Sequence, residues 1–286
     1  MNNQPLVSVL MTAYNREKYI AQAIESVLTS GYKNFELIIV DDGSKDNTVN
    51  IARSFAENDA RVRLYVNEEN LGDYPNRNQA AEYARGEYIK YLDSDDYFLP
   101  GGLEYCISMM INNPEADWGM YYNLEYSSNT ILSSRQSIHD HFFKKPFLLI
   151  GPGGTILKKD FFFNVGKFPT IYGPANDLYF NLKAASKGKL LLLKQDFFHY
   201  RVHNNQERNN KFLYLVNLYN HLNDAIHSLE LGLSAEEERF IIRKNKRRFI
   251  TNSLEYLLRG KEIKKISEAI RLTNFRMADA LQGIFH

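Results

Sequence analysis

The sequence predicts an α/β fold with a mostly parallel central sheet, flanked by helices and followed by a helical C-terminal appendage. Three observations predict it. Short apolar runs typical of buried strands alternate with amphipathic helical stretches in the N-terminal third of the chain. Polar clusters follow directly after three of these runs, at Thr12, Asp41 and Asp93. From Glu207 onward the apolar residues recur only at helical spacing.

Four apolar runs predict the strands of the N-terminal part, at residues 6–11, 35–40, 62–66 and 87–92. The stretches between them predict helices: Ile20 to Leu28, ended by Gly31; a helix capped by Asp46; and about Pro75 to Arg85. A strand-helix alternation of this kind is typical of a parallel sheet with helices on both faces.

Ligands of open α/β sheets bind beyond the carboxyl ends of the strands. We therefore expect the polar residues 12–14, 41–42 and 93–96 to converge on one cleft. No Gly-x-Gly-x-x-Gly follows the first strand and the sequence has no Gly-Lys-Ser/Thr loop, which disfavours a dinucleotide dehydrogenase and a P-loop nucleotidase. Among the ligands that this cleft could bind, a nucleotide whose phosphates are held through a metal is then favoured.

The fourth strand ends in three carboxylates, Asp93, Asp95 and Asp96. Like charges this close raise one another's pKa unless a cation lies between them. Ligands that offer only oxygen suit Mg²⁺ or Mn²⁺ better than Zn²⁺. The alternative is a polar turn in which Asp95 or Asp96 caps a helix that starts near Pro100.

Composition indicates a folded globular chain, with 44% hydrophobic and 24% charged residues among 286. The single cysteine, Cys106, cannot form an intrachain disulfide and fits a reducing compartment. The N-terminus lacks the layout of a signal peptide, and no apolar stretch approaches the roughly 20 residues that cross a bilayer. We expect a cytoplasmic protein that is soluble or peripheral at the inner face of the membrane.

Charge is distributed unevenly along the chain. Residues 239–286 hold twelve Lys or Arg and four acidic residues, a net +8, which leaves −7 for residues 1–238 because the whole chain carries +1. An acidic body argues against nucleic acid as a partner. For the basic segment we weigh helices packed on the body or on a second copy, in a homodimer, against contact with an anionic membrane surface.

Five motifs in order resemble the inverting family 2 glycosyltransferases with the GT-A fold, which is Rossmann-like. They are Val7–Asn15, Glu36–Ser44, Asn70–Gly72 with Arg77–Asn78, Ala84–Ile89, and Leu92–Asp96. The resemblance covers roughly residues 5–205 and implies a GT-A domain at residues 1–206, with a nucleotide-binding half at 1–99 and an acceptor-binding half at 100–206. Residues 207–286 would be a helical extension.

The resemblance implies roles for the nucleotide-binding residues. Thr12, Ala13 and Tyr14 would contact uridine or another base, and Asp41 or Asp42 would accept a hydrogen bond from it. A polar turn before a helix is the alternative for both acids.

The resemblance also places charged residues around the donor. Arg77 would lie near the nucleotide-sugar, although a solvated helix charge is its alternative. Asp95 would bind Mn²⁺ or Mg²⁺ directly, with Asp93 toward the ribose or the metal's waters. His203, in a Tyr-Arg-x-His segment, would reach the metal or the diphosphate.

On the acceptor side, Gly153, Gly154 and Thr155 resemble the glycine-rich strand under the donor sugar. Asp177 stands where the family has its general base, and a helix N-cap is its alternative. Asn176 replaces the family's preceding Glu, which puts the acceptor contacts in doubt. For His139 and His141 we expect a loop lining the acceptor cleft, or plain packing, rather than a metal pair.

The implied function is a metal-dependent transferase of the hexosyltransferase type. It would move a sugar with inversion from a nucleotide-diphosphate sugar, most simply a UDP-sugar, to a glycan or lipid-linked acceptor in surface polysaccharide biosynthesis. A catalytically silent nucleotide-sugar or glycan-binding module is the alternative, supported by Asn176. A metal-dependent phosphohydrolase is weaker, because its aspartyl nucleophile would be expected where Thr12 and Tyr14 stand.

Overall fold

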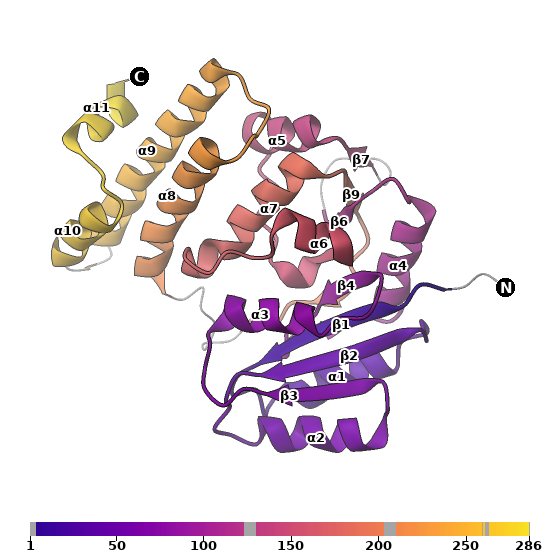
Figure 1. Cartoon of the computed structure of the whole chain (residues 1–286). Coiled ribbons are helices and arrows are strands. Elements are labelled where there is room, and N and C mark those ends of the chain that lie inside the picture. Colours follow the sequence, from indigo (N-terminus) through magenta and orange to yellow (C-terminus); the bar gives the residue numbers. More distant parts are fainter. Residues whose placement is uncertain (1–3, 123–129, 203–209, 259, 261–262, 286) are drawn as a thin grey trace. The chain divides into compact units, whose positions relative to one another are not determined.

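The computed structural model describes residues 4–122, 130–202, 210–258, 260 and 263–285 (Figure 1). These residues form two compact units. The first is drawn from Met1–Ser133, Ile150–Phe168 and Lys187–Arg201, and the second from Ser134–Leu149, Pro169–Ser186 and Val202–His286. Segments of these two units alternate along the chain. The division into a glycosyltransferase domain and an extension near residue 206 stays a prediction.

The first unit is built on one mixed sheet, with strands in the order β3-β2-β1-β4-β8-β6-β9-β7. The strands are β1 Val7–Ala13, β2 Phe35–Asp41, β3 Val62–Val66, β4 Tyr88–Tyr91, β6 Trp118–Tyr121, β7 Ile131–Leu132, β8 Thr155–Lys158 and β9 Leu190–Leu193. The first four in sequence pair in parallel, whereas β8 is antiparallel to β4 and β6, and β7 to β9. The predicted mostly parallel sheet is confirmed.

Helices cover both faces of this sheet, as expected from the alternation. They are α1 Ile20–Leu28, α2 Thr48–Asn58, α3 Asp73–Glu82, α4 Gly102–Asn112 and α6 Lys159–Val165. Val9 of β1 belongs to one core cluster with Ile24 of α1 and Ile107 of α4. On the other face, the Tyr91 ring lies 6.2 Å from that of Phe162.

Two helix boundaries differ from the prediction. Helix α3 begins at Asp73 and ends at Glu82, so the predicted Pro75–Arg85 span was wrong at both ends by two or three positions. The N-cap of α2 is Asn47 rather than Asp46. The Asp46 carboxylate still accepts the Thr48 backbone N–H at 3.0 Å. It therefore satisfies one of the free N–H groups of the first helical turn, although it lies one residue before the N-cap.

The second unit is helical, which confirms the predicted C-terminal helical region. Its helices are α5 Ser134–Phe143, α7 Asn176–Lys187, α8 Lys211–Ser228, α9 Ala235–Leu258, α10 Ile263–Leu272 and α11 Met277–Phe285. The rings of Tyr219, Phe249 and Phe275 lie 4.8–5.6 Å apart in its core. Within the described residues, none of the helices has the length and apolar character needed to cross a membrane.

The aromatic and basic run near residue 140 is helical and packed. Residues 134–143 form α5, so the expectation of a loop there was wrong, while the alternative of packing is confirmed for His141. The buried His141 ring accepts the backbone N–H groups of Phe147 and Leu148 at its Nδ1, each at 3.0 Å. Burial lowers the pKa of His141 to about 3. His221 of α8 is buried too, and burial lowers its pKa to about 4.

These two histidines predict acid sensitivity. Both are neutral in the folded protein at neutral pH, whereas an unfolded histidine takes up a proton below a pKa of about 6.5. Stability is therefore full above that pH and is lost as the pH falls below it, by about 2 kcal/mol per histidine between pH 7 and pH 5. Urea denaturation at both pH values measures this loss. Replacing His221 by Gln should remove about half of the histidine contribution; an undiminished loss in that variant would contradict the assignment.

Candidate functional site

The carboxyl ends of β1, β2 and β4 lie side by side. Ala13 pairs with Asp41, and Leu10 pairs with Tyr91. Hydrogen bonds continue beyond the strands: the backbone N–H of Asp42 donates to the Ala13 carbonyl at 2.8 Å, and the Ser94 hydroxyl donates to the Thr12 carbonyl at 2.7 Å. The structure thus brings together the three polar loops that we expected to meet.

The loop after β1 is fixed on the loop after β2. Asn15 has a left-handed backbone with φ of 54°, which Asn tolerates better than most residues. Its N–H donates to the Ser44 hydroxyl, and its Oδ1 accepts the Lys45 N–H, both at 2.8 Å. Tyr14, one residue earlier, is 43% exposed. The predicted base-contacting loop therefore has a fixed backbone and an accessible aromatic ring.

The two acids predicted to recognise the base are buried and shape the neighbouring loops. The Asp41 carboxylate accepts the backbone N–H and the hydroxyl of Ser44. The Asp42 carboxylate accepts the N–H groups of Leu71 and Gly72, each at 2.9 Å. The Asn67 side-chain amide also donates to Asp42, at 2.9 Å, so of the about four lone-pair positions of this carboxylate one is left for a further donor. Base recognition by either acid stays a prediction.

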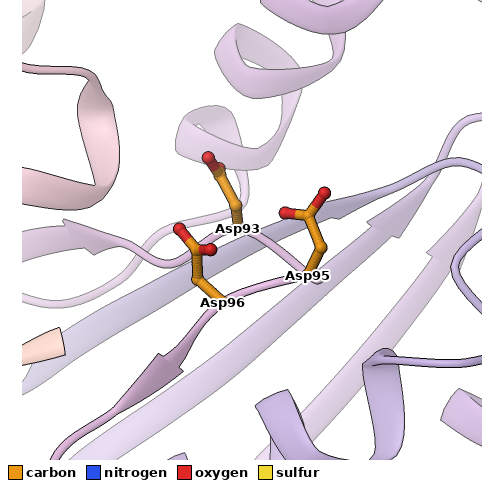
Figure 2. Close-up of side chains that lie close together, drawn as sticks. All are labelled: Asp93, Asp95 and Asp96. Carbon is orange, nitrogen blue, oxygen red and sulfur yellow. The ribbon is translucent and has the colours of Figure 1, made fainter. Parts of the chain in front are cut away.

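Three carboxylates gather just beyond β4, as Figure 2 shows. One oxygen from each of Asp93, Asp95 and Asp96 lies within 4.8 Å of the others. The Asp96 N–H donates to the Asp93 carbonyl at 2.9 Å, and this turn brings the side chains together. Such a donor set of partly buried oxygen atoms fits Mg²⁺ or Mn²⁺. The predicted acid cluster is therefore present, and its chemistry suits the predicted cation.

The buried Asp96 carboxyl differs from an ordinary carboxyl in its pKa. Asp96 is 1% exposed, and burial together with the charge of Asp93 raises its pKa to about 8, against the opposing hydrogen bond from Arg201. A divalent cation between the carboxylates would reverse this effect and favour the ionised form.

Two arginines compensate the other two carboxylates. Arg16 Nε lies 3.0 Å from Asp95 Oδ2, and an Arg77 terminal nitrogen lies 2.6 Å from Asp93 Oδ1. Arg77 Nε also pairs with Asp73 at 2.9 Å. Burial would lower the pKa of Arg77, but these two acids outweigh it and raise the pKa. Arg77 is only 7% exposed, so the alternative of a solvated helix charge was wrong.

A segment from much later in the chain reaches the same carboxylates. Strand β10, Phe198–His199, pairs with β5, Tyr97–Phe98. The Arg201 N–H donates to Asp96 Oδ1 and its guanidinium donates to the Asp95 carbonyl, both at 2.9 Å. His203, the predicted metal or diphosphate contact, lies outside the described residues.

The predicted glycine-rich segment adjoins the acid cluster. A Cβ on Gly153 would lie 3.9 Å from Asp96 Oδ2, and one on Gly154 would collide with the Ile150 side chain. Gly153 is also the partner of Lys90, whose ammonium donates to the Gly153 and Tyr91 carbonyls at 2.5 and 2.6 Å. Burial lowers the pKa of Lys90 to about 8. Lys90 therefore links β4 to the segment of Gly153–Thr155.

Asn176 and Asp177 belong to the second unit, at the start of α7. The buried Asn176 side chain accepts the Tyr172 N–H at 2.9 Å. Asp177 is partly exposed and accepts the Leu178 N–H at 2.8 Å. Because α7 begins at Asn176, Asp177 lies in the first turn, and the N-cap alternative was wrong. Its convergence with the acid cluster stays a prediction.

Sequence reasoning did not assign Arg16, Lys90 or Arg201 to the site. Arg16 pairs with a residue 79 positions away and Arg201 contacts one 105 positions away, so local sequence does not identify these partners, although Arg201 is the Arg of the Tyr-Arg-x-His segment. Lys90 had a visible signal, since a lysine inside an apolar strand must bury its ammonium.

The double ion pair of Arg77 can be tested by substitution. Arg77→Met leaves Asp73 and Asp93 without their cation, so the free energy of unfolding should fall by about 3 kcal/mol. Urea denaturation measures it, with Arg85→Met as control, because the Arg85 side chain is 66% exposed in its pair with Glu36 and should cost at most about 1 kcal/mol. Adding Asp93→Asn to Arg77→Met should recover part of the loss. Equal effects of the two arginine substitutions would contradict this account.

Comparisons with known proteins agree with this site. A family model described as glycosyl transferase family 2 matches residues 8–163, more than half of the chain. The Escherichia coli protein UDP-Glc:alpha-D-GlcNAc-diphosphoundecaprenol beta-1,3-glucosyltransferase WfgD is 43% identical over 124 residues, which cover 43% of this chain and 47% of that protein. An uncharacterized glycosyltransferase of Haemophilus influenzae is 41% identical over 111 residues, which cover 39% of this chain and 44% of that protein. The chain thus spans less than half the length of these two relatives.

Solved structures share the fold. Residues 1–349 of S. aureus TarS superpose with a TM-score of 0.70 at 19% identity, covering 98% of this chain and 81% of that one. The mannosyltransferase PcManGT from Pyrobaculum calidifontis, in complex with GDP-Man and Mn²⁺, superposes with a TM-score of 0.67 at 16% identity. The superposition covers 99% of this chain and 88% of that one. At these identities the likeness establishes the fold, and the predicted GT-A class is confirmed. With the family model spanning the acid cluster and both preceding loops, the chain belongs to glycosyl transferase family 2.

Proposed function

We propose that this protein is an inverting, metal-dependent glycosyltransferase. It moves a sugar from a UDP-sugar to a hydroxyl of a glycan or lipid-linked acceptor, in surface polysaccharide biosynthesis. The observation that carries the proposal is the oxygen cluster of Asp93, Asp95 and Asp96 at the ends of the parallel strands. The name of the related WfgD, which states a UDP-Glc donor and a diphosphoundecaprenol-linked acceptor, supports the choice of substrates.

The acid cluster would hold Mn²⁺ or Mg²⁺, with Asp95 as a direct ligand. When bound, the cation neutralises the charge that develops on the departing nucleoside diphosphate. The surrounding residues orient the cluster: Arg16 holds Asp95, Arg77 holds Asp93, and the Arg201 backbone holds Asp96. These contacts fix the carboxylates in advance, so that little reorganisation is needed when the donor binds.

The loops after β1 and β2 would bind the nucleoside. Thr12, Ala13 and Tyr14 would contact the base, and a carboxylate of Asp41 or Asp42 would accept its ring N–H. Support comes from the accessible Tyr14 ring on a loop that is fixed by Asn15.

Asp177 is the proposed general base. Its carboxylate would accept the proton of the acceptor hydroxyl as that oxygen attacks the anomeric carbon opposite the departing diphosphate, which inverts the configuration. The hydrogen bond from the Leu178 N–H orients the carboxylate, and Asn176 supports the turn before it through Tyr172. An amide can serve this structural purpose, so the Asn in place of Glu does not by itself argue for a silent module.

The basic segment 239–286 is the part of the chain for which we weighed a membrane surface and a second copy of the chain as partners. Ile241 and Phe249 are buried within the second unit, whereas Phe240 is 44% exposed, so packing accounts for part of the apolar residues there. Contact of this segment with an anionic membrane stays a proposal. Flotation of the whole protein with anionic vesicles at low ionic strength, reversed by salt, would support it; indifference to the vesicles would exclude it.

Substitutions of Asp95 and Asp42 should distinguish the residue that binds the metal from the residue that recognises the base. Calorimetry of the whole protein with UDP, with and without Mn²⁺, measures both. Asp95→Ala should abolish the part of the affinity that depends on metal, a loss of about tenfold or more. Asp42→Ala should weaken UDP binding to a similar degree whether or not metal is present.

Asp59→Ala is the control for these two variants. Asp59 pairs with Arg61 before the amino end of β3, whereas the site lies at the carboxyl ends of the parallel strands. It should bind UDP like the unmodified protein. The assignment fails if Asp95→Ala and Asp42→Ala show the same dependence on metal, and the metal-dependent function fails if the unmodified protein does not bind UDP with Mn²⁺.

The general base should act on transfer without affecting nucleotide binding. Asp177→Asn keeps the size of the side chain and removes the proton acceptor, so transfer or donor hydrolysis should fall by about 10²–10⁴-fold while UDP affinity is kept. Asp160→Asn is the matched control, because Asp160 also lies in the first turn of a helix, α6. Transfer that survives in Asp177→Asn would remove Asp177 from the mechanism, and absence of transfer in the unmodified protein would favour the silent module.

A further inference from the structure

The second unit contains a pocket that the proposed chemistry does not use. It lies among α5, α7, α8 and α9 and has a volume of about 180 Å³. We call it the leucine pocket, after the leucines that line it: Leu148, Leu149, Leu178, Leu182, Leu218 and Leu222. A cavity of about 150 Å³ lined by such side chains can hold a benzene molecule, so this pocket can take a short piece of hydrocarbon.

The same pocket has polar groups with fixed hydrogen-bonding roles. His141 accepts two backbone N–H groups at Nδ1, so its proton must be on Nε2. His221 lies 2.9 Å from the Asn217 carbonyl through Nδ1, and because a carbonyl only accepts, that nitrogen carries the proton. Both rings line the pocket and are neutral. Because the His141 ring lines the pocket, its Nε2–H is the hydrogen-bond donor that this side chain can offer to a ligand.

Two cations complete the lining, Lys244 and Arg248 of α9. One terminal nitrogen of Arg248 donates to the Leu218 carbonyl at 2.8 Å and to Asn245 Oδ1 at 2.9 Å. Burial lowers the pKa of Arg248. Among the residues that the structure describes, neither cation forms an ion pair with a carboxylate.

For Arg248 this lack of an acid is unusual, because its guanidinium is only partly exposed to water, whereas Lys244 is exposed. Arg77 is buried against two carboxylates, and Lys246, also on α9, pairs with Asp279 at 2.8 Å. A desolvated cation without an anion is costly, and a bound anion would offset that cost. Apolar walls beside two cations and a neutral N–H donor thus complement a hydrocarbon chain that ends in an anion, and the several oxygen atoms of a phosphate can meet all three polar groups.

We propose that the leucine pocket binds a lipid phosphate, with the hydrocarbon among the leucines and the phosphate at His141, Lys244 and Arg248. The inference rests on the proposed function and names its acceptor class: the lipid phosphate is the carrier to which the acceptor sugar is attached. Leu178 of the pocket follows Asp177 directly on α7. The lipid phosphate therefore binds at the same end of α7 that carries the proposed general base.

The test uses the whole protein and farnesyl phosphate, kept below its micelle-forming concentration, in calorimetric titrations. Saturable binding is expected, with farnesol and inorganic phosphate each at least about tenfold weaker, because each offers only half of the contacts. Arg248→Gln should weaken farnesyl phosphate about tenfold, and Lys244→Gln about threefold because Lys244 is exposed.

Two further variants locate the site. Leu178→Trp adds bulk to a partly exposed residue of the pocket and should abolish binding. Arg243→Gln is the matched control, because Arg243 neighbours Lys244 in sequence and does not line the leucine pocket; its affinity should be unchanged. Thermal melting of each variant identifies any that is unfolded, and Lys244→Gln, at an exposed position, remains informative if Arg248→Gln does not fold.

The proposal is overturned if the folded protein does not bind farnesyl phosphate saturably, if farnesol binds equally well, or if Leu178→Trp binds as before. UDP with Mn²⁺ is titrated into the same samples. Nucleotide binding without lipid phosphate binding would reject the leucine pocket and leave the proposed transferase intact. Lipid phosphate binding without nucleotide binding would reject the transferase and keep the pocket as a lipid phosphate site.

Discussion

Repulsion among the three carboxylates beyond β4 is the constraint on which the surrounding structure depends. Parallel pairing of β1, β2 and β4 brings polar loops to one edge, and the short turn at Asp93–Asp96 concentrates negative charge there. Arg16, in the loop after β1, and Arg77, on helix α3, form ion pairs with two of these carboxylates, and the backbone N–H of Arg201, after β10, donates to the third. Charge compensation therefore also joins distant parts of the first unit around the proposed donor site.

The sequence predicted the part of this arrangement that is encoded locally. Strands such as β2 are recognisable because they are apolar throughout, as expected for strands buried on both faces. Helix α3 was misplaced because its buried face includes Asn76 and Arg77, which blur the apolar periodicity that marks a helix. The acid cluster was found because its members are contiguous. Of their partners, Arg77 was placed near the donor through the family resemblance, whereas Arg16 and Arg201 were not assigned, since they meet the acids only through the tertiary fold.

The residues expected to bind substrates also stabilise the protein. Asp42 anchors the loop at Leu71–Gly72, Arg77 neutralises two acids, and Asn176 caps the Tyr172 backbone. Residues at the strand ends therefore serve the fold and the proposed chemistry together. Activity measured on variants at these positions combines both effects, and stability has to be measured alongside it.

The alternation of the two units along the chain limits where this protein can be divided. Helices α5 and α7 come from the middle of the sequence but belong with the C-terminal helices. The Tyr172 hydroxyl donates to Asp224 of α8 at 3.0 Å, and a Cβ on Gly173 would lie 2.8 Å from the Asn217 amide nitrogen. A chain ended after residue 206 would keep both middle segments and expose the apolar side chains that α8 and α9 cover. Shortening this protein from its C-terminus would thus yield an aggregation-prone fragment rather than a minimal catalytic domain.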